Sequence, residues 1–315
     1  MEITSINTES LSRMFLAGAK NLDAKKEWIN ELNVFPVPDG DTGTNMSMTI
    51  MSAAREVGAL SNPTMKELAK AISSGSLRGA RGNSGVILSQ LFRGFTREIK
   101  GKEVVDVKTL AQAFVHATET AYKAVMKPKE GTILTVAKGM ADKAVEAAEE
   151  TDDILEFGSR VIEHGDYVLS QTPEMLPVLK KAGVVDAGGK GLCIIFEGML
   201  SLLRDGVMIN IDAPVEVKKE NTDDFFKNAA AEFDSEINFT YCTEFIVGKN
   251  DNATADSVAE LRAYLEGIGD CVVVVEDDDI IKTHVHTENP GLALETALKY
   301  GQLLTVKVEN MREQH

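Results

Sequence analysis

Two carboxylates lie one residue apart in a short segment whose prolines disfavour a helix. Pro36 and Pro38 hold the backbone extended just before Asp39 and Asp41, so both carboxylates can reach one small volume. Gly43 then opens a stretch of helical periodicity, and the unpaired N–H groups at the start of a helix attract anions. Carboxylates beside such a helix end suit a Mg²⁺ ion that bridges phosphate oxygens.

The alternative for this segment is an ordinary helix N-cap and turn, since Asp and Gly are common in both. Here Thr42, Thr44 and Asn45 follow the carboxylates directly, and this concentration of polar groups favours a functional site. An EF-hand is excluded, because its sixth position would be Thr44 rather than Gly and its twelfth Ile50 rather than Glu.

Two further glycine-rich segments each precede a helical stretch. Gly79–Gly85 offers backbone N–H donors, the Ser84 hydroxyl and nearby Arg81, although close helix packing would also explain its glycines. Val185–Gly191 contains Gly-Gly-Lys-Gly without the spacing of a P-loop, and no Gly-x-Gly-x-x-Gly follows a strand. A Walker-type ATPase and a Rossmann dehydrogenase are both disfavoured.

Helices must position these segments, because helical periodicity continues from Thr8 to about Asp205 and predicts about eight helices. Residues 212–235 carry mixed charges and little apolar periodicity, which indicates a linker. Short β-branched and aromatic runs after Asn238 alternate with helical windows in the order β-α-β-β-α-β, typical of a ferredoxin-like fold. We therefore expect a multi-domain chain: an all-α domain at residues 1–211, the linker at 212–235 and an α+β domain at 236–315.

Composition narrows the function classes. A net charge of −16 disfavours nucleic acid and anionic lipid as partners. The sequence has no apolar run long enough to insert stably in a membrane and no signal-peptide core, and three scattered cysteines do not make a disulfide framework. We expect a soluble, cytoplasmic protein.

Three motifs carry a resemblance to a known family. They are Pro-x-Pro-Asp-Gly-Asp-Thr-Gly-x-Asn-Met, Arg-Gly-Asn-Ser-Gly-Val and Gly-Val-Val-Asp-Ala-Gly-Gly-Lys-Gly, in this order. Together they resemble the nucleotide domain of the dihydroxyacetone kinase superfamily, and more closely the catalytic subunit of bacterial fatty acid kinase. The resemblance extends to Tyr241-Cys-Thr-Glu-Phe and His284-Val-His-Thr-Glu-Asn-Pro-Gly. It implies an eight-helix barrel that binds ATP and Mg²⁺ at one end.

The resemblance also implies roles for individual residues. Asp39 and Asp41 would be the main Mg²⁺ ligands, and Asn33 stands nearest to a third metal-binding Asp of dihydroxyacetone kinases. That Asp lies five residues before the pair in those kinases, whereas Asn33 is one residue further away and neutral. Thr42 also replaces the His of those kinases. The phosphates and the rest of the nucleotide would contact Thr42, Gly43, Thr44, Asn45, Asn83, Ser84, Gly131, Asp186, Ala187 and Gly188.

The function implied is transfer of the γ-phosphate of ATP to the carboxylate of a fatty acid held by a separate fatty-acid-binding protein. The acyl phosphate formed would feed phospholipid synthesis. Arg81 is our candidate for charge stabilisation at the transferred group; the alternative is an exposed Arg beside a glycine turn. Other open readings are a kinase subunit for dihydroxyacetone or a similar polyol, and a regulatory nucleotide-binding module without chemistry. We expect the C-terminal domain of the family's three-domain form to be lacking.

The α+β domain carries a second candidate site. His284 and His286 lie two apart on an expected strand, as do Cys242 and Glu244, so each pair shares one face. In a ferredoxin-like sheet these strands are neighbours, which predicts zinc bound by Cys242, His284 and His286, with Glu244, water or a partner group as the fourth ligand. The alternative is a packed histidine pair and a buried thiol. Cys271 is expected in the core, and the open sheet edge at Leu303–Val308 predicts a homodimer.

Overall fold

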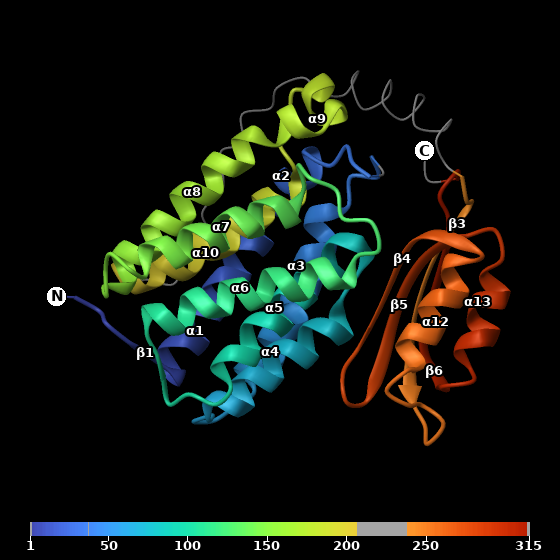
Figure 1. Cartoon of the computed structure of the whole chain (residues 1–315), viewed down its shortest axis with the longest axis horizontal. Helices are drawn as coiled ribbons and strands as arrows, with labels where there is room; N and C mark the ends of the chain where they lie inside the picture. Colours follow the sequence, from blue (N-terminus) through green and yellow to red (C-terminus); the bar gives the residue numbers. More distant parts are fainter. Residues whose placement is uncertain (1, 37, 207–237, 314–315) are drawn as a thin grey trace. The chain divides into compact units, whose positions relative to one another are not determined.

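The computed structural model describes residues 2–36, 38–206 and 238–313. The chain divides into two compact units, Met1–Tyr122 with Pro128–Asp223 and Lys123–Lys127 with Asp224–His315. The first is helical and the second combines helices with a sheet (Figure 1). The expected linker at residues 212–235 lies outside the described residues.

The helical unit contains ten helices among its described residues. Eight of them have 15 or more residues, and α2 and α9 have six each. Their bounds are α1 Thr8–Ala24, α2 Lys26–Glu31, α3 Thr42–Gly58, α4 Met65–Gly79, α5 Gly82–Ile99, α6 Val107–Ala124, α7 Ile133–Ala147, α8 Ile154–Met175, α9 Pro177–Ala182 and α10 Ala187–Asp205. The expectation that no strand interrupts this half was wrong in one detail, because β1 Ile6–Asn7 pairs with β2 Val104–Val105.

Local sequence signals set several helix ends. The Asn7 side chain accepts from the Ser10 N–H at the start of α1, and Thr64 and Glu67 form a reciprocal capping box on α4. Gly183 and Gly206 adopt the left-handed conformation that ends α9 and α10. Within the described residues, no helix is long and apolar enough to cross a membrane.

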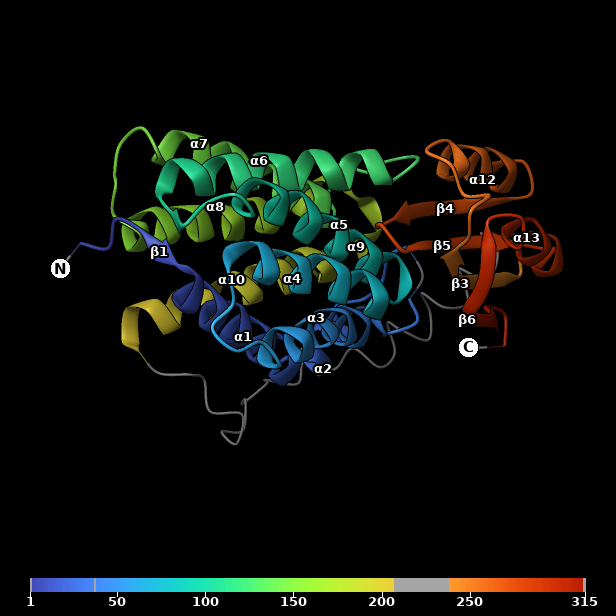
Figure 2. The same cartoon turned by 90° about the horizontal axis from the view of Figure 1, so that it is seen from below.

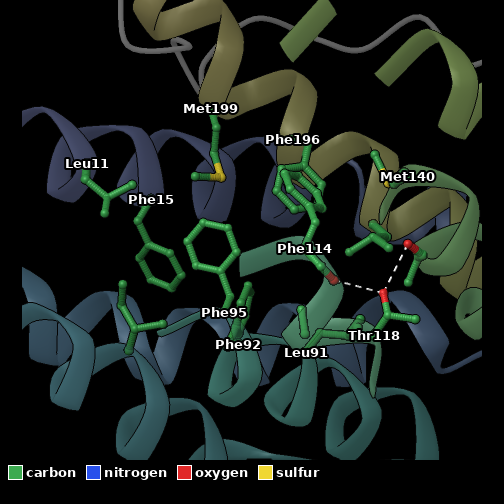
Figure 3. Close-up of a pocket in the computed structure, with 14 residues that line it drawn as sticks. Leu11, Phe15, Leu91, Phe92, Phe95, Phe114, Thr118, Met140, Phe196 and Met199 are labelled. Atoms are coloured by element: carbon green, nitrogen blue, oxygen red, sulfur yellow. Dashed lines mark hydrogen bonds between the residues drawn. The ribbon is translucent and has the colours of Figure 1, made fainter. Parts of the chain in front are cut away.

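Aromatic side chains fill the middle of the helical unit (Figure 3). Phe15 and Phe92 meet edge to face with ring centroids 5.4 Å apart, and Phe114 lies 5.0 Å from Phe196. They leave a cavity of about 40 Å³ with an almost wholly apolar lining. The Thr118 hydroxyl, which is on the lining, is satisfied by the carbonyls of Phe114 and Ala137 at 3.0 and 3.2 Å. A cavity of this size and polarity is expected to stay dry.

The second unit is a four-stranded antiparallel sheet with two helices. The elements are β3 Tyr241–Lys249, α12 Ser257–Glu266, β4 Gly269–Glu276, β5 Ile280–Thr287, α13 Pro290–Ala297 and β6 Gly301–Asn310, in the order that the sequence predicts. The strands lie in the order β4-β5-β3-β6 (Figure 2). One face packs on α12 and α13 through Phe245, Val247, Leu261, Leu265, Val272, Val274, Ile281, Val285, Ala293 and Ala297.

The other face of this sheet is polar and carries the expected metal ligands. Side chains alternate along a strand and cross-strand partners share a face, so the pairs Cys242–His286 and Glu244–His284 lie together on it. Strand β6 forms one edge of the sheet, and its Leu304, Val306 and Val308 side chains are exposed.

Candidate functional site

The acidic loop before α3 is closed by one buried side chain. Asn33 donates from Nδ2 to Asp39 Oδ1 at 2.7 Å, and its Oδ1 accepts from the Thr42 hydroxyl at 2.6 Å. Asn33 therefore joins the acidic pair to the first residue of α3. Asp41 is the N-cap residue of α3, but its side chain makes no capping hydrogen bond. Its carboxylate is thus not committed to the helix end.

The two carboxylates of the loop interact with each other. Asp39 is exposed on one side, but the protein atoms around its carboxylate together with the charge of Asp41 raise its pKa to about 7, despite the opposing hydrogen bond from Asn33. Without a counter-ion, two such carboxylates resist being charged together. A divalent cation between them would remove that repulsion, so the pair has the charge and the oxygen donors that Mg²⁺ requires.

Helix α2 holds the first turn of α3 in place. Asn30 donates to the Thr44 hydroxyl and accepts from the Thr44 N–H, both at 3.0 Å. Gly43 packs so closely on α2 that a Cβ there would lie 2.0 Å from the Lys26 carbonyl oxygen. The sequence analysis missed Asn30, whose only signal is an amide side chain in the helix just before the loop.

The second glycine-rich segment lies against the first. Arg81 is the N-cap residue of α5 without a side-chain capping bond, and its N–H donates to the Thr49 hydroxyl at 3.4 Å. Gly82 has φ +57°, and a Cβ there would lie 2.5 Å from Asn45 Nδ2. Asn83 and Ser84 follow in the first turn of α5. The start of α5 is therefore packed on the start of α3.

The remaining predicted residues lie at the starts of α7 and α10. Gly131 has φ +84°, and its N–H donates to the Thr135 hydroxyl at 2.8 Å. Asp186 caps α10 by accepting from the Gly189 N–H at 2.7 Å, and burial raises its pKa to about 7. Ala187 and Gly188 open the helix, and a Cβ on Gly188 would lie 3.2 Å from Ile133 at the start of α7.

Four helix N-termini consequently gather at one end of the helical unit (Figure 1). Besides the contact of α5 on α3 and of α7 on α10, the first turn of α10 reaches α3, since a Cβ on Gly191 would lie 2.7 Å from Met46. Side chains cap α7 and α10, whereas α3 and α5 have no side-chain cap. The uncapped pair, beside the acidic loop, offers N–H donors to an anion and carboxylates to its cation.

The second unit brings the other predicted ligands together. Ligand atoms of Cys242, His284 and His286 all lie within 4.8 Å of one another. Burial lowers the pKa of His284, but Cys242 and Glu244 outweigh it and raise the pKa overall. Burial and the neighbouring charge of His284 lower the pKa of His286.

Cys271 does not lie in the core, as the sequence analysis expected. It is half-buried, and its ligand atom lies within 4.8 Å of those of Asp270 and His286. Its φ of +50° falls where the register of β4 against β5 shifts between Asp270 and Val273. A bulge of this kind redirects a side chain, and the β-rich sequence around Cys271 gives no sign of it.

Family comparisons agree with the class of protein that this helical architecture and its acidic loop define. The family model described as the DAK2 domain matches residues 36–201. The chain belongs to the DAK2 domain family. A second model, described as the FakA-like middle domain of fatty acid kinase, matches residues 238–315.

Similar curated proteins are longer than this chain. An uncharacterized protein of Staphylococcus saprophyticus is 44% identical over 99% of the chain, and one of Staphylococcus epidermidis is 46% identical over 99%. The chain spans 56% of the length of each. Among solved structures, the dihydroxyacetone kinase from C. freundii in complex with AMP-PNP and Mg²⁺ is 15% identical with a TM-score of 0.48, covering 62% of this chain and 34% of that one.

Proposed function

We propose that this chain is an ATP- and Mg²⁺-dependent kinase. The observation that carries the proposal is the acidic pair Asp39 and Asp41 beside the uncapped starts of α3 and α5. A bound Mg²⁺ supplies charge neutralisation for the β- and γ-phosphates. Membership of the DAK2 domain family supports a phosphotransferase.

Residue roles follow from the placement of each side chain. Asp39 and Asp41 hold the metal, while Asn33 fixes the Asp39 carboxylate and remains the proposed third metal ligand. Thr42, Gly43, Thr44 and Asn45 contact the phosphates from α3, and Asn83 and Ser84 do so from α5. Gly131, Asp186, Ala187 and Gly188 border the nucleotide from α7 and α10, and Arg81 stabilises charge on the transferred group.

The proposed acceptor is the carboxylate of a fatty acid presented by a separate fatty-acid-binding protein. The similarity of residues 238–315 to the FakA-like middle domain of fatty acid kinase supports this acceptor. A carboxylate is already ionised at pH 7, so transfer requires positioning and charge neutralisation but no general base. The product, an acyl phosphate, would serve phospholipid synthesis.

We also propose an architecture and a setting for this activity. The eight longer helices would form a barrel in a domain of residues 1–211, and the sheet order β4-β5-β3-β6 supports a ferredoxin-like domain at 236–315. The exposed apolar residues of edge strand β6 support a homodimer formed by that domain. A cytoplasmic location completes the proposal. Zinc at Cys242, His284 and His286 is a separate proposal, independent of the kinase chemistry.

Two other functions remain distinguishable by experiment. A dihydroxyacetone-type kinase subunit would transfer phosphate to a small polyol, and a regulatory module would bind ATP without transfer. The test incubates the chain with γ-labelled ATP, Mg²⁺ and a purified bacterial fatty-acid-binding protein loaded with fatty acid. We expect labelled acyl phosphate with wild type and little with Asp41→Asn. Label on dihydroxyacetone presented by its own carrier protein, or ATP binding with no transfer to either acceptor, would refute the fatty acid assignment.

A further inference from the structure

Two histidine ring nitrogens face each other on the polar side of the sheet. His284 Nε2 and His286 Nε2 are 3.2 Å apart, and both side chains are buried. Two imidazoles on one tetrahedral zinc, each with a bond of about 2.0–2.1 Å, place their nitrogens roughly 3.3 Å apart. The observed separation is therefore the one that a shared metal ion would require.

A thiol completes a set of three ligands. Cys242 is the cross-strand partner of His286, and its Sγ lies 4.0 Å from the nearer nitrogen of His284. We propose that Cys242 Sγ and the Nε2 atoms of His284 and His286 bind a zinc ion, and that Glu244 and Asp270 orient the two imidazoles. Three protein ligands leave the fourth tetrahedral position to water or another added ligand.

The carboxylates lie on the opposite sides of the two rings. Glu244 Oε1 is 2.9 Å from His284 Nδ1, and Asp270 Oδ1 is 3.7 Å from His286 Nδ1. A carboxylate that accepts from Nδ1–H leaves Nε2 free for the metal, as in many zinc sites. Glu244 is therefore a positioning residue. This replaces the sequence-based suggestion that it could be the fourth ligand.

A second triplet shares one histidine with the first. Asp270, Cys271 and His286 could hold a metal on the Nδ1 side of His286. One neutral imidazole has a single lone pair for a metal, so the two triplets are alternatives. The facing Nε2 atoms and the 2.9 Å contact of Glu244 on His284 favour the first triplet.

Spectroscopy with cobalt separates the two triplets without any assay of kinase activity. The full chain, purified without a His-tag and stripped of metal, is titrated with Co²⁺ and then with Zn²⁺. We expect one equivalent to bind, with a thiolate-to-cobalt charge-transfer band. Cys242→Ser should abolish the band, whereas Cys271→Ser should keep it. The reverse pattern would overturn the assignment, as would the lack of stoichiometric binding to a folded wild-type chain.

The roles of the carboxylates require a graded measurement. Loss of an outer-shell partner typically weakens metal binding 10- to 100-fold, and we expect Glu244→Gln and Asp270→Asn each to fall within that range. Both variants should keep the charge-transfer band, because the three ligands remain. Unchanged Zn²⁺ affinity in both would refute the positioning role. Cys193→Ser, which removes a buried thiol of the helical unit, is the matched control and should bind as wild type. Asp41→Asn should also bind zinc normally, so failure of the kinase proposal would not affect this result.

Discussion

Gly82→Ala should disturb the proposed nucleotide site through a single methyl group. Gly82 has φ +57°, and its new Cβ would lie 2.5 Å from Asn45 Nδ2. A left-handed conformation costs an L-residue about 1–2 kcal/mol, and displacing Asn45 adds roughly 1–3 kcal/mol of overpacking. For a unit of this size, about 1 kcal/mol lowers Tm by roughly 2–4 °C. We expect a loss of about 4–20 °C for Gly82→Ala.

A second glycine isolates the effect of conformation alone. Gly206 ends α10 with φ +67°, and no described atom lies within 4 Å of its Cβ position. It also stands at the far end of a helix of 19 residues, about 28 Å from the candidate site. Gly206→Ala should therefore lower Tm by only about 2–8 °C.

Nucleotide affinity provides the decisive comparison between these variants. Titration calorimetry with ATP and Mg²⁺ should show at least tenfold weaker binding to Gly82→Ala, about 1.4 kcal/mol, because Asn45 is displaced at the shared start of α3 and α5. Gly206→Ala should bind ATP as wild type. Equal losses of Tm in the two variants together with unchanged ATP affinity in Gly82→Ala would show that the start of α5 takes no part in the site.

Three further predictions address charge, pH and assembly. Asp41→Asn should lower turnover on the order of 10²-fold or more while the fold survives, and near-wild-type turnover at saturating carrier and Mg²⁺ would contradict the metal assignment. Asp186 has a pKa raised to about 7 in the folded chain, so the folded state binds the extra proton and the free energy of unfolding should fall by roughly 4 kcal/mol between about pH 4 and pH 7. Asp186→Asn keeps a capping oxygen and should flatten that slope in thermal melts; an unchanged slope would show that Asp186 is not its source. Light scattering should find a dimer for the full chain and a monomer for Met1–Asp212, and a dimeric fragment would place the interface elsewhere.

The sequence determined the local features of both candidate sites. The prolines and carboxylates before α3 specify an acidic loop at a helix start because each acts through its immediate neighbours. Helical periodicity predicted the long helices for the same reason. His284 and His286 could be assigned to one face because side-chain direction in a strand depends only on residue parity.

Only the tertiary structure decided which local features meet. The clamp of Asn30 on Thr44 and the contact of Gly82 with Asn45 depend on how helices cross, which no short motif encodes. Likewise, a bulge with positive φ moved Cys271 from its expected core position to His286, and the pairing of β3 with β5 set Glu244 against Nδ1 of His284. Periodicity fixes the face on which a side chain lies, but the atoms that it contacts depend on the packing of elements distant in the chain.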